Sequence, residues 1–132
     1  MGTLNDKQAQ LLLDKNFASI ATVNADGSPH VTPVWVDWDG EAVLVNTLRG
    51  RVKERNITRH PRVEVLVYNL ENPYQYVRVS GHAELVEESA EEHIDTLTKK
   101  YLGEDRYPWR ASGDTRVIVR VRPERVSDQG IE

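Results

Sequence analysis

A short basic segment, from Arg49 to Arg62, is the part of the sequence whose residue types most directly indicate chemistry. It holds one acid, Glu54, and six basic residues: Arg49, Arg51, Lys53, Arg55, Arg59 and Arg62. The segment therefore carries +5, and because the whole chain carries −4, the remaining residues together carry −9. A local positive field on an otherwise acidic protein favours a small anionic ligand over a polyanion.

The spacing inside this segment suits a phosphate site at the start of a helix. Arg51, Arg55 and Arg59 recur every four residues, so a helix stacks them on one face, at a cost of roughly a few tenths of a kcal/mol per pair. Lys53 lies on another side, beside Asn46-Thr47 at the end of the preceding predicted strand. Backbone N–H groups, the helix dipole and the cations there all favour an anion. On charge alone, a solvated basic helix face is an equally good interpretation.

Aromatic residues form a second candidate group. Four of them lie on a predicted strand or in predicted loops, without helical periodicity: Trp35, Tyr74, Tyr76 and Trp109. A flat conjugated ligand stacks on such faces. Each of these residues taken alone is better explained as an ordinary core or interface aromatic.

Several classes of site are excluded. The chain has no cysteine, which rules out disulfides, thiolate metal sites and cysteine nucleophiles. The four histidines lack the spacing of zinc ligands, and no serine lies in a nucleophile elbow. No glycine-rich phosphate loop occurs, so the chain is neither a Rossmann nor a P-loop protein. We therefore predict no metal site and no catalytic acid–base residue.

Three short helices are expected to position these residues. They run from an Asn5 cap to about Lys15, over the basic segment to before His60-Pro61, and from a Ser89 cap to about Tyr101. Asn5 with Gln8, and Ser89 with Glu92, have the spacing of capping boxes.

The other elements are predicted strands, over residues 17–24, 30–38, 41–46, 63–68, 74–87 and 116–122. Asp26-Gly27 predicts a hairpin, Pro33 an edge or bulge, and Gly81 a bend or bulge. Three consecutive antiparallel strands favour a mainly β fold, a small Greek-key β-barrel with short helices, formed by residues 1–132 as a single domain.

The surroundings of the protein are constrained by what the sequence lacks. No stretch approaches the roughly eighteen apolar residues that span a bilayer, and residues 1–16 lack a signal-peptide pattern. The acidic balance argues against nucleic acid. We expect a soluble, cytoplasmic protein whose partners include neither nucleic acid nor a membrane.

Four segments together resemble the pyridoxamine 5'-phosphate oxidase-like, FMN-binding split-barrel superfamily. They are Phe17–Val23 followed by Asp26–Trp35, Arg51-x-Lys53-x-x-Asn56 followed by Arg59-x-Pro61-Arg62-Val63, Gly81–Leu85, and Arg120–Val126. No single motif identifies the superfamily, but the order of the four segments is specific. Together the segments extend over nearly the whole chain. Within the superfamily, the sequence is most similar to the branch that binds the 8-hydroxy-5-deazaflavin coenzyme F420.

The resemblance implies a homodimer with the cofactor at the subunit interface. It implies that the cofactor phosphate is held by Thr47, Arg51, Lys53 and Asn56, with Asn46 beside Thr47 in the cofactor site. It further implies that Pro33, Val34 and Trp35 border the tricyclic ring, and that Tyr74, Tyr76 and Trp109 arrive from the partner subunit. Pyridoxamine phosphate oxidases carry a C-terminal substrate-binding segment that this sequence, ending at Glu132, lacks, so vitamin B6 oxidation is not expected.

The function implied is that of an F420-dependent oxidoreductase, which reduces a small unsaturated or quinone-like substrate by hydride transfer. The cofactor does the redox chemistry in such enzymes, and the protein positions it. An FMN-dependent oxidoreductase of the same fold is the nearest alternative, because both cofactors present a phosphate and a tricyclic ring. A non-catalytic flavin- or haem-binding protein is another, and a single-strand nucleic-acid module is disfavoured by the −9 outside the basic segment.

Overall fold

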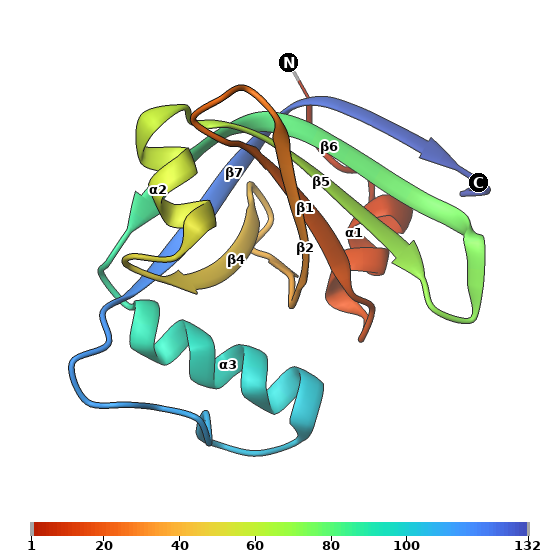
Figure 1. The fold of residues 1–132 in the computed structure, drawn as a ribbon. Coiled ribbons are helices and arrows are strands. Elements are labelled where there is room, and N and C mark those ends of the chain that lie inside the picture. Colours follow the sequence, from red (N-terminus) through yellow and green to blue (C-terminus); the bar gives the residue numbers. More distant parts are fainter. Residues whose placement is uncertain (1, 132) are drawn as a thin grey trace.

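The computed structural model describes residues 2–131 as one curled, seven-stranded antiparallel sheet with three helices around it (Figure 1). The helices are α1 (Asp6–Leu13), α2 (Val52–Arg59) and α3 (Ala90–Leu102). The strands are β1 (Ala18–Val23), β2 (Pro29–Val34), β3 (Asp37–Trp38), β4 (Val43–Leu48), β5 (Arg62–Asn69), β6 (Asn72–Val86) and β7 (Arg116–Gln129). Their order across the sheet is β2-β1-β5-β6-β7-β4-β3. The prediction of a mainly β split barrel is confirmed.

The core fills the concave side of this sheet. Alternate residues of the central strands point inward, as the period-2 geometry of a strand requires. The register carries one such inward row from Val34 through Ala18 and Val67 to Val77. Valine dominates the buried set, which includes Val43, Val45, Val63, Val65, Val67, Val77, Val79, Val117, Val119 and Val121. Branched side chains of this kind suit a half-buried pleated surface.

β6 is long enough to pair with β5 and β7, and it bends at Gly81. The register of the β6–β7 pair shifts between Ser80 and Gly81, which confirms the predicted bulge. A Cβ atom added at Gly81 would lie 2.4 Å from the carbonyl oxygen of Arg122. Only glycine therefore allows the two backbones to approach this closely.

The strand predicted over residues 30–38 is wrong as a single element. It divides into β2, which pairs with β1, and β3, which pairs with β4 at the opposite edge of the sheet. The three strands predicted consecutively over residues 17–46 are therefore not all neighbours in the sheet. Between β2 and β3 the chain crosses over, and Val36 is fully buried with its N–H bonded to the Tyr101 hydroxyl rather than to a strand. Pro33 does lie on an edge strand, as predicted.

Two further predictions need correction. The last strand continues to Gln129 rather than ending at Arg122, because β6 offers pairing partners as far as Tyr76. The capping box at Asn5 and Gln8 forms, but the one at Ser89 does not. Ser89 has a φ of 64°, and its side chain makes no cap hydrogen bond, because the chain enters α3 through a left-handed residue.

α3 lies across one end of the barrel and is tied to it by polar contacts (Figure 1). The Tyr101 hydroxyl accepts the N–H of Val36 at 3.1 Å and donates to the carbonyl of Asn16. The Lys100 ammonium donates to the carbonyl of Val36 at 2.6 Å and to that of Leu12. These contacts hold α3 at the chain crossover, beside the end of β2. Within residues 2–131, no helix has the length and apolar character needed to cross a membrane.

Candidate functional site

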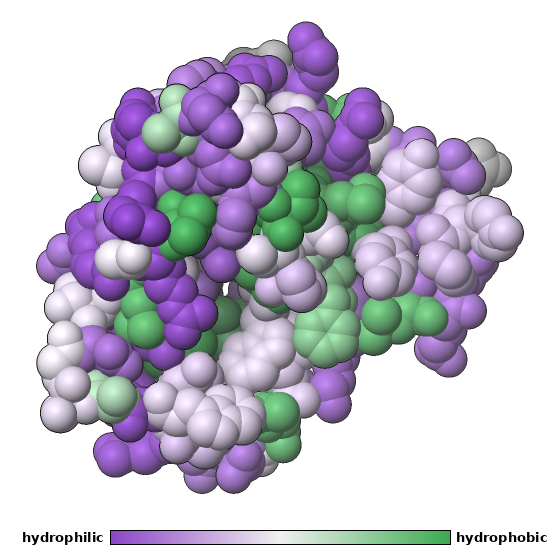
Figure 2. Space-filling model, in the orientation of Figure 1, coloured by the Kyte–Doolittle hydropathy of each residue, from purple (hydrophilic) through white to green (hydrophobic). Residues whose placement is uncertain are grey.

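A pocket of about 320 Å³ lies between α3, the barrel and the start of α2. Figure 2 shows the surface hollowed between α3 and the barrel, with apolar and hydrophilic patches meeting around the hollow. The pocket is built by the ends of β2 and β4, the first turn of α2, one side of α3 and the loop that leads into β7. Its volume is at the lower end of the range for small-molecule sites, roughly 300–1,000 Å³.

One wall of the pocket is aromatic and apolar. The Trp35 ring stacks on Tyr101, with centroids 5.2 Å apart and planes at 6°, and Tyr107 meets Trp35 edge-on at 6.3 Å. Trp109 meets Tyr107 edge-on at 5.5 Å and is 64% exposed at the mouth. The apolar lining is completed by Phe17, Pro33, Val34, Ile94 and Leu97. Flat faces of this kind can accept a planar ring.

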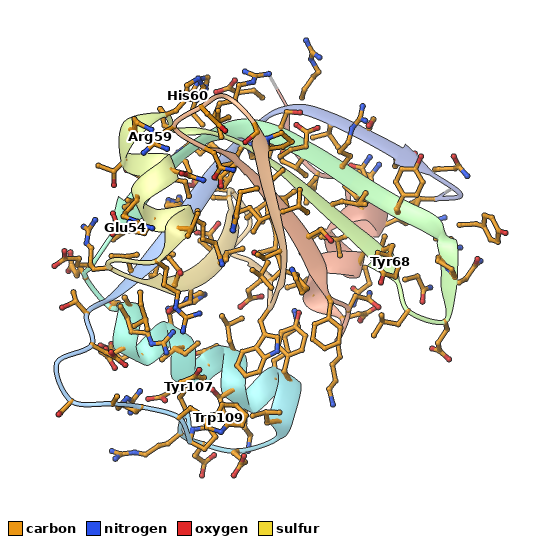
Figure 3. All side chains as sticks on the ribbon, in the orientation of Figure 1. Glu54, Arg59, His60, Tyr68, Tyr107 and Trp109 are labelled. Atoms are coloured by element: carbon orange, nitrogen blue, oxygen red, sulfur yellow. The ribbon has the colours of Figure 1, made fainter. Side chains whose placement is uncertain are left out.

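The loop that carries two of these aromatics is fastened to α3. Figure 3 shows Tyr107 and Trp109 beside that helix. The Arg110 guanidinium pairs with Asp95 at 2.9 Å and with Glu91 at 3.2 Å, both on α3. Asp95 also accepts the backbone N–H of Tyr107 at 2.9 Å. The aromatic wall is thus supported by ion pairs on its outer side.

The opposite side of the pocket is cationic. Arg51, Lys53 and Arg116 all line it, and none of the three pairs with a carboxylate within residues 2–131. Partial burial, together with the neighbouring Arg51, lowers the pKa of Lys53 below its ordinary value. A bound anion would oppose both effects, so the charge balance of the pocket suits an oxyanion.

Arg116 is a pocket residue that the sequence did not reveal. It is the first residue of β7, opposite Leu48 at the end of β4, and only 8% of it is exposed. Its Nη1 donates to Oδ1 of Asn46 at 3.2 Å, and its guanidinium lies 4.5 Å from the centroid of the Tyr107 ring. Neither contact neutralises its charge. No local sequence motif predicts that Arg116 lines the pocket, because its position depends on pairing between distant strands.

The start of α2 leaves backbone donors free. Arg51 occupies the N-cap position without a side-chain cap bond, so the first-turn N–H groups lack the usual capping acceptor. Asn46 and Thr47, at the end of β4, also line the pocket next to this turn. The predicted phosphate ligands other than Asn56 therefore surround one pocket.

Glu54, the one acid of the basic segment, is directed away from these cations. It is 7% exposed and lies on the first turn of α2 (Figure 3). Its carboxylate accepts the Gly50 N–H at 2.7 Å and the Thr58 hydroxyl at 2.8 Å, and it lies 3.5 Å from Arg49. Arg49 also pairs with Glu87 at 2.9 Å. The acid therefore organises the turn before α2 and leaves Arg51 and Lys53 uncompensated.

Replacing Glu54 with glutamine is expected to lower the free energy of unfolding by about 1.5–3 kcal/mol at pH 7, the range for hydrogen bonds to a charged group. The Gly50 N–H, followed by Thr58 and Arg49, holds the pKa of Glu54 below its ordinary value. This stabilisation is therefore complete above the unfolded-state pKa, about 4.3, and is lost as the pH falls through the lower folded-state value. Urea denaturation at pH 7 and pH 3 measures the difference. Equal losses for Glu54→Gln and the exposed control Glu88→Gln would contradict this role.

Three predicted site residues do not line the pocket. Asn56 lies on the buried face of α2, where its side chain donates to the Thr22 hydroxyl at 3.0 Å and to Asn24 Oδ1 at 2.9 Å. Tyr74 is 76% exposed, and the Tyr76 hydroxyl contacts Gln129, both near the end of the β6–β7 pair that lies away from α3. The placement of these two tyrosines in a partner's site stays a prediction.

Comparison with known proteins identifies the family of the chain. Residues 4–130 match the family described as pyridoxamine 5'-phosphate oxidase. The chain belongs to this family. A solved structure named F420 reductase is 32% identical to this member, with a TM-score of 0.81, over 94% of this chain and 98% of the other.

Solved structures of lower sequence identity share the fold. A conserved hypothetical protein from Mycobacterium tuberculosis is 24% identical, with a TM-score of 0.74, over 96% of this chain and 85% of that one. HupZ from Group A Streptococcus is 21% identical, with a TM-score of 0.70, over 98% of this chain and 97% of that one. At these sequence identities, the structural similarity shows only that the fold is shared.

Proposed function

We propose that this protein is an F420-dependent oxidoreductase that reduces a small unsaturated or quinone-like molecule by hydride transfer. The observation that carries the proposal is that three cations, Arg51, Lys53 and Arg116, converge with an aromatic wall in one pocket. None of the three has a carboxylate partner in the described part of the chain. Such a pocket fits a ligand that has both a phosphate and a flat ring. The 32% identity to a protein named F420 reductase supports the deazaflavin as that ligand.

Different residues of the pocket bind the phosphate and the ring of the cofactor. Arg51, Lys53 and the free N–H groups at the start of α2 hold the phosphate. Trp35, with Pro33 and Val34, borders the ring. When bound, the cofactor supplies the hydride chemistry. α3 and the loop with Tyr107 and Trp109 limit access of water to the reacting face.

A preference for F420 over FMN would come from cations beyond the phosphate site. F420 carries an anionic oligoglutamyl tail, and FMN does not. Arg49 is already paired with Glu87 and Glu54, which leaves Arg55 and Arg59, both exposed on α2, to meet such a tail. Exposed pairs contribute only about 0.2–1 kcal/mol each and are weakened by salt.

Titration of the purified protein with F420 and with FMN, at low and at high salt, tests the choice of cofactor. We expect tighter binding of F420 at low salt and a smaller difference at high salt. Oxidation of reduced F420 in the presence of a quinone, followed by absorbance, then tests for turnover. Equal affinities at both salt concentrations, or a preference for FMN, would replace this proposal with the FMN-dependent alternative.

We also propose that the protein is a homodimer whose pocket is completed by a second copy. The support is the outer face of the sheet, opposite the core. Val31 is 59% exposed there, and the register aligns Pro33, Ser19 and Leu66 in an outward row. Partly exposed apolar side chains on a sheet face, here Val31, Pro33 and Leu66, are typical of an interaction surface.

Light scattering is expected to give about twice 15.1 kDa. Val31→Asp should convert the protein to a monomer, because it places an unpaired charge in the proposed interface. It should also weaken cofactor binding if the partner contributes to the site. A monomeric wild-type protein that binds cofactor tightly would contradict the shared site.

A further inference from the structure

A network of three polar side chains reaches from the pocket into the interior beside α3. Asn46 is its centre. Its Oδ1 accepts a hydrogen bond from Arg116 Nη1 at 3.2 Å. Its Nδ2 lies 2.9 Å from the carbonyl oxygen of Ala90 and 3.0 Å from Nδ1 of His93. The network thus joins a pocket cation on β7 to the first turn of α3 through β4.

The orientation of the Asn46 amide follows from these partners. The Ala90 carbonyl can only accept a hydrogen bond, so the amide nitrogen must face it. The second hydrogen of that nitrogen then points at His93 Nδ1, which must be unprotonated to accept it. Burial lowers the pKa of His93, and this favours the neutral ring. Its proton is therefore on Nε2, an atom that is buried without a hydrogen-bond partner in the described structure.

This network orients the Arg116 guanidinium without neutralising its charge. A carboxylate at position 46 would bind the guanidinium and cancel its charge. The amide oxygen of Asn46 and the face of Tyr107 instead fix its place while leaving its full charge facing the pocket. Arg116 is 8% exposed. A buried cation that, like Arg116, has no acid partner among residues 2–131 is costly unless a ligand provides one.

We propose that Arg116 is a third cation that binds an oxyanion of the pocket ligand, and that Asn46 and His93 are positioning residues that hold its guanidinium there. The inference rests on the proposed function for the identity of the ligand. The chemistry required is only an oxyanion, which F420, FMN and inorganic pyrophosphate all offer. A neutral His93 is needed, because a proton on Nδ1 would oppose the Asn46 N–H and turn its oxygen away from Arg116.

Replacing Arg116 with glutamine tests the first part. Titration calorimetry with F420, FMN and pyrophosphate should show at least about tenfold weaker binding, the loss expected for one charge-assisted hydrogen bond. Arg116→Lys should recover part of the affinity, because it keeps the charge. Arg125→Gln is the matched control, since Arg125 is an exposed residue of the same strand outside this pocket.

His93 variants test the second part. His93→Asn keeps an acceptor where Nδ1 lies and should bind the same probes nearly as well as the wild type. His93→Leu removes the acceptor and should weaken binding severalfold. In the Arg116→Gln background, His93→Leu should have no further effect on affinity, because the residue that it positions is absent. A merely structural role would lower the melting temperature of His93→Leu without this dependence on Arg116.

The outcomes separate this inference from the choice of cofactor. If F420 binds Arg116→Gln as tightly as it binds the wild type, the inference is wrong and the proposed function stands. If the wild type binds pyrophosphate through Arg116 but neither F420 nor FMN, the oxyanion subsite stands and the proposed function is wrong. Equal effects of His93→Leu with and without Arg116, or no binding of any probe to the wild type, would also overturn the inference.

Discussion

Replacing Arg51 and Lys53 together with alanine is expected to weaken the binding of FMN and of F420 by about a hundredfold or more. Each side chain lines the pocket, and neither pairs with a carboxylate of residues 2–131. Each is therefore available for a charge-assisted hydrogen bond to the phosphate. Such bonds contribute about 1.5–3 kcal/mol each, and two of them exceed a hundredfold in affinity. Titration calorimetry of both single variants and the double variant measures the loss.

Arg55 provides the control for this double variant. It lies on the exposed side of the same helix and does not line the pocket. Arg55→Ala should leave FMN affinity unchanged and should reduce F420 affinity only slightly, and only at low salt. Unchanged affinity in Arg51→Ala/Lys53→Ala would remove the basic segment from the site.

Replacing Tyr101 with alanine is expected to lower the free energy of unfolding by about 3–5 kcal/mol, the cost of truncating a buried aromatic side chain. The ring stacks with both Phe17 and Trp35, at centroid distances of 5.4 and 5.2 Å. Its hydroxyl is the partner of the buried Val36 N–H. Burial raises the pKa of Tyr101 to about 12, so the hydroxyl remains a donor at any pH where the protein is used.

Urea denaturation of three variants separates the contributions at this position. Tyr101→Phe keeps the stacked ring but leaves Val36 without its partner, which should cost about 1–3 kcal/mol. Tyr74→Ala removes an exposed ring and should change stability by less than about 0.5 kcal/mol. If Tyr101→Ala and Tyr74→Ala are equally stable, Tyr101 does not join α3 to the barrel.

The elements that were predicted correctly depend on local chemistry. The Asn5 and Gln8 capping box forms within one helical turn. Pro33 lacks the N–H that a central strand needs, and it lies on an edge strand. Gly81 lies where a side chain would collide with the opposite backbone. In each case the residue type itself limits the conformation, so the prediction does not require knowing which distant segment lies opposite.

The elements that were missed depend on contacts between distant segments. No residue near Val36 in the sequence predicts the break between β2 and β3. The break depends on the hydrogen bond from the Val36 N–H to the hydroxyl of Tyr101, 65 residues later in the chain. Ser89 looks like a helix cap, but the approach of the chain from β6 imposes a left-handed conformation instead. Secondary-structure propensity describes the conformation that a segment prefers in isolation, and at these positions tertiary packing overrides that preference.

The candidate site shows the same division. Spacing within the basic segment placed Arg51 and Lys53 beside the end of β4, which is where the pocket lies. The inward direction of Glu54 and the contribution of Arg116 could not be predicted in this way. Glu54 finds its donors in the turn that the fold creates, and Arg116 reaches the pocket only because β7 pairs with β4.

A crystal structure of the protein with bound F420 is the most direct test of the central claim, that this pocket is the cofactor site. We expect the phosphate within hydrogen-bonding distance of Arg51, Lys53 and the first N–H groups of α2, and the ring against Trp35. A phosphate bound away from Arg51 and Lys53, or a ring outside the space between α3 and the barrel, would contradict the account.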